Sequence, residues 1–191
     1  MENKITGCVF DLDGTLADTA PDIAIALNNS LNDAGLRQVP VESVKEMIGN
    51  GIPVLVRRAL FHIEAPEDLA ADVITSMLAY SRKYYCEKSS LMHGVKDCLE
   101  GLKKRGIPMS ICTNKDETVA QMVVSALDLN SYFYAIVGSR PNLVKKPDPS
   151  MLQIAAEAIN SPMETTMMIG DSEVDAATGI AASSISVIVR G

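Results

Sequence analysis

The stretch Asp11-Leu12-Asp13-Gly14-Thr15 comes directly after a short apolar run, Ile5 to Phe10. An apolar run of this length that ends in a polar, glycine-containing loop predicts a buried strand. Residues two apart point the same way while the backbone stays extended, so we expect both carboxylates on one side of the loop. Two carboxylates that close repel each other unless a cation or a proton lies between them. The pair therefore indicates a site for a hard cation with oxygen ligands.

The two residues that follow the acid pair suit an anion. Gly14 has no side chain, so backbone N–H groups near it can approach an anion closely. Thr15 can cap a helix or form a local hydrogen bond. An isolated pair of aspartates is more often a turn with capping residues. Its place directly after an apolar strand and before Gly14-Thr15 favours a functional site instead.

Four further apolar runs predict strands, and helical patterns separate them. The strand candidates are residues 107–112, 133–137, 166–169 and 185–189, and the helix candidates are 94–105, 116–127, 149–159 and 173–182. Strands that alternate with helices of this length indicate βαβ units. We therefore expect an α/β fold with a Rossmann-like, parallel five-stranded sheet. In such sheets ligands bind at the carboxyl ends of the strands.

A block of helices interrupts this alternation between about Asp18 and Ser90, where no strand signal is found. Its helical stretches are Pro21 to Ala34, Val41 to Met47, Pro53 to His62 and Pro66 to Glu87. Three of them begin with proline, which is favoured in the first turn of a helix. The block is too long for a simple crossover between strands. It predicts a second, helical domain at residues 18–90, with residues 1–17 and 91–191 forming the α/β domain.

Polar residues also follow three of the other predicted strands. Thr113-Asn114 offers a hydroxyl and an amide that can hold phosphate oxygens, or that can cap the next helix. Pro147 keeps Lys146 extended, which limits where its ammonium points. Asp171 ends a strand and Asp175 lies one helical turn later, so both can face the same spot. Each group alone has an ordinary reading as a cap or a solvated loop. Together they converge on the edge where such sheets bind ligands.

Composition narrows the classes of partner. The net charge of −7 argues against nucleic acid, because phosphate backbones attract basic surfaces. No stretch of about 18 uncharged apolar residues exists, so we expect no membrane span. The N-terminus lacks the long apolar region of a signal peptide. The four cysteines fit no zinc pattern, and we expect buried, reduced thiols in a cytoplasmic protein.

The ordered set of an acid pair, a hydroxyl, a lysine and a second acid pair resembles the haloacid dehalogenase superfamily of phosphatases. The motifs that match are D-x-D-G-T at Asp11, Asp13, Gly14 and Thr15, the strand-end threonine at Thr113, the lysine of K-P-x-P at Lys146, and G-D-x-x-x-D at Asp171 and Asp175. The helical block looks like that superfamily's inserted α-helical cap domain. The true dehalogenases do not keep the second aspartate, so Asp13 favours phosphate chemistry.

Further matches resemble the phosphoglycolate phosphatases. They are Ile48-Gly49-Asn50-Gly51 followed by Val56 to Leu60, Tyr84-Tyr85, and Thr113-Asn114-Lys115. The resemblance implies a cytoplasmic monomer or homodimer that hydrolyses a small phosphorylated metabolite with Mg²⁺, and 2-phosphoglycolate is the first choice. A pyrophosphatase, a sugar-phosphate phosphatase or a phosphosugar mutase of the same superfamily is the alternative. A further alternative is a non-catalytic binding protein with this fold, but the complete set of motifs argues against it.

The resemblance also implies a role for each motif residue. Asp11 would form an aspartyl-phosphate, and Asp13 would act as general acid and then as general base. Mg²⁺ would be held by Asp11, the Asp13 carbonyl and Asp171. Phosphate would be bound by Gly14, Thr113, Asn114 and Lys146. Thr15 and Asp175 would not touch the substrate or the metal but would orient the residues that do. Asn50 or Arg57 of the cap would contact the substrate's carboxylate.

Two features depart from the family's pattern. The stretch Ala181-Ala182-Ser183-Ser184 lacks a glycine that is common there, so we expect the last helix to end differently. The sequence ends at Arg190-Gly191, directly after the last predicted strand, where relatives usually continue with a loop and a helix. We therefore expect that edge of the sheet to be less covered.

Overall fold

The computed structural model describes residues 5–189, and the chain divides into two compact units. The first unit, here called the sheet unit, combines Met1–Asp18 with Leu91–Gly191. The second, the helical unit, is Thr19–Ser90. The sequence prediction assigns residue 18 to the helical domain, whereas the contacts place it in the sheet unit.

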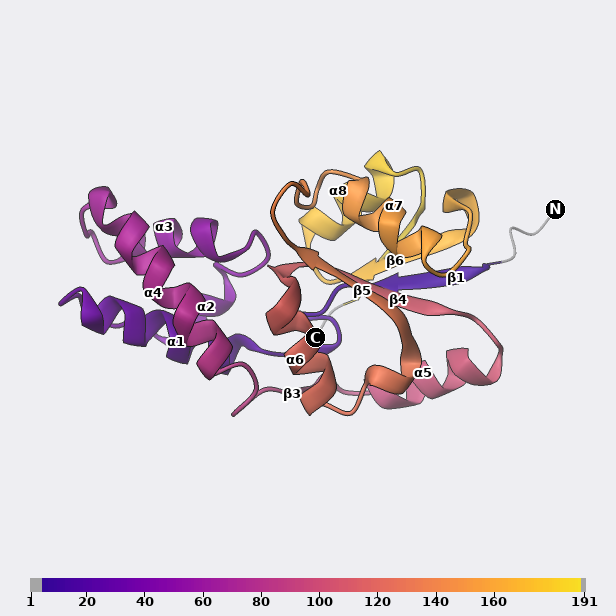
Figure 1. Cartoon of the computed structure of the whole chain (residues 1–191), viewed down its shortest axis with the longest axis horizontal. Coiled ribbons are helices and arrows are strands. Elements are labelled where there is room, and N and C mark those ends of the chain that lie inside the picture. Colours follow the sequence, from indigo (N-terminus) through magenta and orange to yellow (C-terminus); the bar gives the residue numbers. More distant parts are fainter. Residues whose placement is uncertain (1–4, 190–191) are drawn as a thin grey trace. The chain divides into compact units, whose positions relative to one another are not determined.

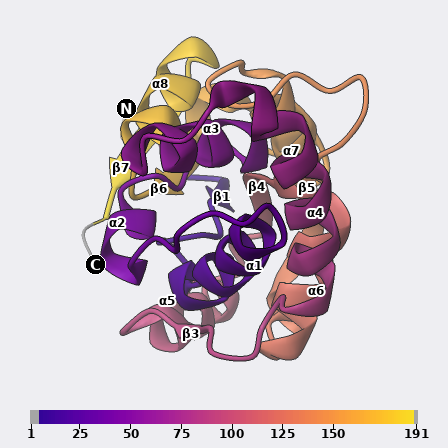
Figure 2. The ribbon, with the colours of Figure 1, turned by 90° about the vertical axis from the view of Figure 1, so that its left-hand side faces the viewer.

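The sheet unit contains five parallel strands in the order β5-β4-β1-β6-β7, which Figure 2 shows from one edge to the other. The strands are β1 (Gly7–Phe10), β4 (Met109–Asp116), β5 (Phe133–Ser139), β6 (Thr166–Gly170) and β7 (Ile185–Ile188). The predicted α/β fold with a parallel five-stranded sheet is therefore confirmed. Because β1 is central, the loop that follows it lies between the ends of β4 and β6.

Helices cover both faces of the sheet (Figure 1). They are α5 (Val95–Lys104), α6 (Glu117–Ala126), α7 (Ser150–Glu157) and α8 (Glu173–Ala181), with short 3-10 turns η2 (Asn130–Tyr132) and η3 (Met163–Thr165). Helices α7 and α8 lie on one face, and α5 and α6 lie on the other. Helix α8 ends before Ser183, which has a φ of 58°. A serine thus takes the left-handed conformation that favours glycine.

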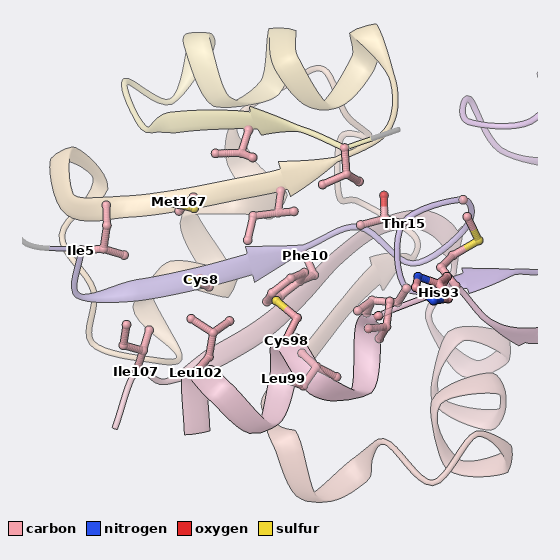
Figure 3. Close-up of a pocket in the computed structure, with 18 of the residues that line it drawn as sticks. Ile5, Cys8, Phe10, Thr15, His93, Cys98, Leu99, Leu102, Ile107 and Met167 are labelled. Atoms are coloured by element: carbon pink, nitrogen blue, oxygen red, sulfur yellow. The ribbon is translucent and has the colours of Figure 1, made fainter. Parts of the chain in front are cut away.

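The two faces of the sheet are packed differently. Val9 and Met168 point to the α7 side, where they join a buried apolar cluster. On the other side an apolar pocket of about 760 Å³ lies between α5 and the sheet, where Phe10, Met167 and Leu99 are among its lining residues (Figure 3). Side chains alternate along a strand, so neighbouring residues of β1 and β6 serve opposite faces.

The cysteine prediction holds for two of four residues. The four cysteines, which all lie among the described residues, form no disulfide, and Cys8 and Cys112 are buried. Cys86 is half-buried and Cys98 is exposed, so the expectation of burial is wrong for Cys98. That residue lies on α5 and lines the open pocket. Burial raises the pKa of the Cys8 thiol to about 11, so this thiol stays neutral.

The helical unit is built from four α-helices around its own apolar core. They are α1 (Ala20–Asp33), α2 (Val41–Lys45), α3 (Ile52–His62) and α4 (Ala70–Lys83), with a 3-10 turn η1 (Glu67–Leu69) before α4. Leu27, Leu31 and Leu60 are fully buried in this core. Among the described residues, no helix combines the length and the apolar character needed to cross a bilayer.

Two details of the helical prediction are wrong. A single helix was expected from Pro66 to Glu87, but a 3-10 turn precedes α4, and Tyr84 leaves the helical conformation with φ −112° and ψ 57°. Two short paired strands, β2 (Ala17–Asp18) and β3 (Ser90–Leu91), were not expected. Strands of two residues are too short to produce a periodic signal.

A buried carboxylate joins the two ends of the helical unit. Asp22, in the first turn of α1, is 1% exposed. Its oxygens accept hydrogen bonds from the Lys88 N–H at 3.0 Å, the Ser89 N–H at 2.7 Å and the Ser89 hydroxyl at 2.6 Å. A buried carboxylate needs such donors, so the start and the end of the unit are held together.

Candidate active site

Asp11 stands at the carboxyl end of the central strand. Its backbone N–H donates to the Ile169 carbonyl of β6 at 2.8 Å, so the chain is still extended there. The loop then turns at Gly14, which has a φ of +84° and donates its N–H to the Ala17 carbonyl at 2.8 Å. A Cβ atom at Gly14 would collide with the carboxylate of Asp171. Both observations require glycine at this position.

Lys146 connects the first and the last acidic motifs. Its Nζ lies 2.8 Å from Asp11 Oδ1 and 2.6 Å from Asp175 Oδ1. All three side chains are buried. Burial raises the pKa of Asp11 to about 7, and the ammonium of Lys146 opposes that shift. Burial alone would lower the pKa of Lys146, but the carboxylates of Asp11 and Asp175 outweigh it and raise it, so Lys146 stays charged.

Asn114 holds the backbone on which Lys146 sits. Its side-chain oxygen accepts from the Lys146 N–H at 2.9 Å, and its side-chain amide donates to the Lys146 carbonyl at 3.1 Å. These two bonds connect the end of β4 to a loop 32 residues later. They locate the ammonium of Lys146 at the end of the central strand.

Asp175 has two tasks. Ser172 is the N-cap of α8, and its hydroxyl accepts from the Asp175 N–H, while Asp175 Oδ2 accepts from the Ser172 N–H at 3.1 Å. This reciprocal pair is a capping box. Asp175 Oδ1 remains for Lys146. The capping role considered for Asp171 therefore belongs to Ser172, and Asp171 is left to face the loop after β1.

Three carboxylates form a group that fits a divalent cation. Asp11, Asp171 and Asp175 each offer one oxygen, and these oxygens lie within 4.8 Å of one another. Thr15 donates its hydroxyl to Asp171 at 2.9 Å. Asp11 Oδ1 is buried and lies 2.8 Å from the Lys146 ammonium. Carboxylate oxygens gathered this closely suit a hard cation such as Mg²⁺.

The carboxylate of Asp13 turns to a different partner. Lys115 Nζ donates to Asp13 Oδ1 at 2.9 Å, and their side chains are 12% and 13% exposed. The sequence offers Lys115 only within the Thr113-Asn114-Lys115 resemblance and predicts no role for it. Its signal was its place next to Thr113-Asn114 at the end of a predicted strand. Thr113 is buried, and its hydroxyl accepts from the Lys115 N–H at 3.3 Å.

The two expected site residues of the helical unit have local contacts. Arg57 donates to the Pro53 carbonyl of its own helix at 3.2 Å and lies 3.9 Å from Glu67. The side-chain oxygen of Asn50 accepts from Arg58 at 2.9 Å. These contacts stay within the unit, in contrast to the long-range contacts of the sheet-unit residues.

Known proteins are similar to this chain in sequence and in fold. A family model described as haloacid dehalogenase-like hydrolase matches residues 8–189. A phosphoglycolate phosphatase of Colwellia psychrerythraea is 35% identical over 184 residues, which are 94% of this chain and 81% of that protein. One from Pseudomonas fluorescens is 37% identical over 172 residues, 87% of this chain and 62% of that protein. The chain is thus shorter than these curated relatives.

A solved structure is similar over almost the whole chain. The crystal structure of a predicted phosphoglycolate phosphatase from Haemophilus somnus superposes with a TM-score of 0.88. It is 28% identical, and the match covers 98% of this chain and 86% of the other. The fold is therefore shared with that protein.

Proposed function

The chain belongs to the haloacid dehalogenase-like hydrolase family, and on that premise we propose that it is a Mg²⁺-dependent phosphatase acting on 2-phosphoglycolate. The single observation that carries the proposal is the position of Asp11. It is a buried carboxylate at the end of the central strand, with the Lys146 ammonium 2.8 Å from its Oδ1 and with oxygens of Asp171 and Asp175 within 4.8 Å. The names of the relatives support the choice of substrate.

In the first step a carboxylate oxygen of Asp11 attacks phosphorus, and the bond from phosphorus to the ester oxygen breaks. The product on the enzyme is an aspartyl-phosphate. Asp13 donates its proton to the departing ester oxygen. In the second step water attacks phosphorus, Asp13 takes a proton from that water, and inorganic phosphate leaves while Asp11 is regenerated.

Phosphate is held by groups that arrive from separate strands. The Lys146 ammonium and the Thr113 hydroxyl bind phosphoryl oxygens. Other backbone N–H groups of the loop that Gly14 shapes complete the contact, because the Gly14 N–H itself is donated to the Ala17 carbonyl. Charge on those oxygens increases in the transition state, so a buried ammonium stabilises that state most. We assign Asn114 to holding the Lys146 backbone, where the sequence alone suggested a direct contact with phosphate.

Asp11 and Asp171, with the backbone carbonyl of Asp13, would hold Mg²⁺. When bound, the ion would supply positive charge that reduces the repulsion between the anionic phosphate and the anionic nucleophile. Thr15 orients Asp171 through its hydroxyl, and Asp175 orients Lys146. Both residues thus act on the site through a neighbour.

The oligomeric state, the compartment and the substrate contacts of the helical unit remain proposals, and each has its own support. Every proposed site residue of the sheet unit comes from one chain, so a monomer holds a full set and a homodimer would hold two. Four cysteines that form no disulfide among the described residues favour a reducing compartment such as the cytoplasm. Arg57 and Asn50 stay candidates for contact with the substrate's carboxylate, because both belong to the helical unit, which resembles the superfamily's cap domain.

Phosphate release from a panel of monoesters, with and without Mg²⁺, tests the proposal. We expect 2-phosphoglycolate to be among the best substrates by kcat/KM, and chelation of Mg²⁺ to abolish turnover. Better turnover of pyrophosphate or a sugar phosphate would overturn the substrate assignment. Absence of phosphate release from every ester in the presence of Mg²⁺ would overturn the assignment as a phosphatase.

A further inference from the structure

We propose that Lys115 recognises a carboxylate on the leaving group of the substrate. The inference rests on the proposed function, because it takes Asp13 as the group that contacts the ester oxygen. Lys115 would then be a specificity-determining residue of the sheet unit. The sequence alone indicates only Asn50 and Arg57 of the helical unit for contact with the carboxylate.

The contact between Lys115 and Asp13 determines where the ammonium lies. Lys115 Nζ is 2.9 Å from Asp13 Oδ1, and both residues belong to the sheet unit. A general acid must come within about 3 Å of the ester oxygen that it protonates. The ammonium therefore lies within about two hydrogen-bond lengths of the leaving group's oxygen, with Asp13 in contact with both.

The size of the leaving group matches this position. In 2-phosphoglycolate one carbon separates the ester oxygen from the carboxyl carbon, so the carboxylate oxygens lie roughly 3 to 4 Å from the ester oxygen by ordinary bond lengths. A carboxylate at that distance can accept from Lys115 Nζ while the ester oxygen contacts Asp13. A longer leaving group would carry its anion past the ammonium.

The charge and burial of Lys115 indicate an anionic ligand. An ammonium has three donors, and one is used on Asp13 Oδ1. The side chain is only 12% exposed, so bulk water has little access to the other two. A neutral leaving group would cover the ammonium with carbon and offer those donors no acceptor, whereas a carboxylate would supply a charge-assisted hydrogen bond.

The alternative role is purely one of support. Lys115 could serve only to orient Asp13, in which case it would affect every substrate that needs an acid and would not distinguish anionic from neutral leaving groups. A test must therefore compare ligands that differ only in the carboxylate, and it must include a measurement that does not depend on proton transfer.

Binding of two non-hydrolysable phosphonates in the presence of Mg²⁺ meets both needs. One is 3-phosphonopropionate, which carries the carboxylate, and the other is propylphosphonate, which lacks it. We expect Lys115→Met to raise the Kd of 3-phosphonopropionate about 30-fold and that of propylphosphonate less than about threefold, as for loss of one charge-assisted hydrogen bond. Lys115→Arg should restore part of the difference. The matched control, Lys104→Met on the exposed side of α5, should change neither Kd.

Equal changes in both Kd values, or no change in either, would overturn the inference, and so would failure of the wild type to prefer 3-phosphonopropionate.

Turnover of 2-phosphoglycolate, ethyl phosphate and p-nitrophenyl phosphate by the same variants provides a second check. Equal losses on the two alkyl esters, with p-nitrophenyl phosphate spared, would assign Lys115 to the support of Asp13 alone. A wild type that binds the phosphonates selectively but hydrolyses no ester would refute the proposed function and leave the recognition role standing.

Discussion

The sheet unit and the helical unit place the polar side chains of their candidate site residues in opposite ways. In the sheet unit, polar contacts join residues far apart in the sequence, such as Lys115 with Asp13, 102 positions away, and Thr15 with Asp171, 156 positions away. In the helical unit, Arg57 contacts a carbonyl four positions away. Buried long-range pairs need the whole fold, whereas local surface contacts need only a helix. We therefore expect substitutions to affect chemistry in the sheet unit, and stability or substrate preference in the helical unit.

The largest effect is expected at the nucleophile. Asp11→Asn keeps the shape of the side chain and removes the attacking carboxylate, so kcat should fall by at least about 10⁴-fold, as for loss of other covalent nucleophiles. Steady-state phosphate release measures the change, and trapping by BeF₃⁻ should fail in the variant. Activity above about 1% of the wild type would show that Asp11 is not the nucleophile.

Lys146→Met should rank second. Loss of the ammonium removes a buried contact with developing charge, and kcat/KM should fall by about 10³-fold. It should also lower the free energy of unfolding by about 3 kcal/mol, because Asp11 and Asp175 lose the cation between them. Neighbouring Lys145→Met is the matched control. A comparable loss in that variant would mean that the loop, and not the buried ammonium, matters.

In the helical unit the largest effect should be on stability. Asp22→Ala leaves the N–H groups of Lys88 and Ser89 without their acceptor, and should cost about 2 kcal/mol in urea unfolding. The exposed Asp72, in the first turn of α4, provides a control in Asp72→Ala, for which we expect no more than about 0.5 kcal/mol. Equal costs for the two variants would remove the distinction drawn between buried and exposed carboxylates of this unit.

The pH dependence of stability should report the buried charge at Asp11. Its folded pKa of about 7 lies above the usual value, so the folded state favours the protonated acid. This contribution is present at pH below the unfolded pKa and is lost as pH rises through about 7. Without Mg²⁺, Asp11→Asn should therefore be more stable than the wild type at pH 8 by at least about 1 kcal/mol, and nearly equal to it at pH 4. Thermal unfolding measures both, and a constant difference across this range would contradict the assignment.

The smallest effect is expected at Arg57. Its side chain is 54% exposed and its ion pair with Glu67 is 3.9 Å long. Even if it meets the substrate's carboxylate, an exposed charge contributes little, so Arg57→Ala should lower kcat/KM for 2-phosphoglycolate only about threefold. A larger loss than that of Lys115→Met would shift the recognition of the carboxylate to the helical unit.

The sequence by itself determined the class of the fold and the nature of the catalytic edge. Apolar runs located all five strands of the large sheet to within a few residues, because a strand buried on both faces must be apolar along its length. The acid pair after β1 and the lysine and acids after later strands could be assigned to one edge, since parallel strands bring their carboxyl ends together. The two-residue strands β2 and β3 and the end of α4 could not be predicted from such patterns.

Only the tertiary structure decided which of these groups touch. No sequence periodicity relates Lys115 to Asp13. No local pattern indicates that the Asn114 side chain hydrogen-bonds to the Lys146 backbone. The same holds for Asp175, which both caps α8 and contacts the Lys146 ammonium. Such contacts depend on strand order and on a loop conformation that Gly14 permits. The physical reason is that residue type determines what a side chain can bind, whereas its partner is determined by distances that the packed chain sets across more than 100 positions.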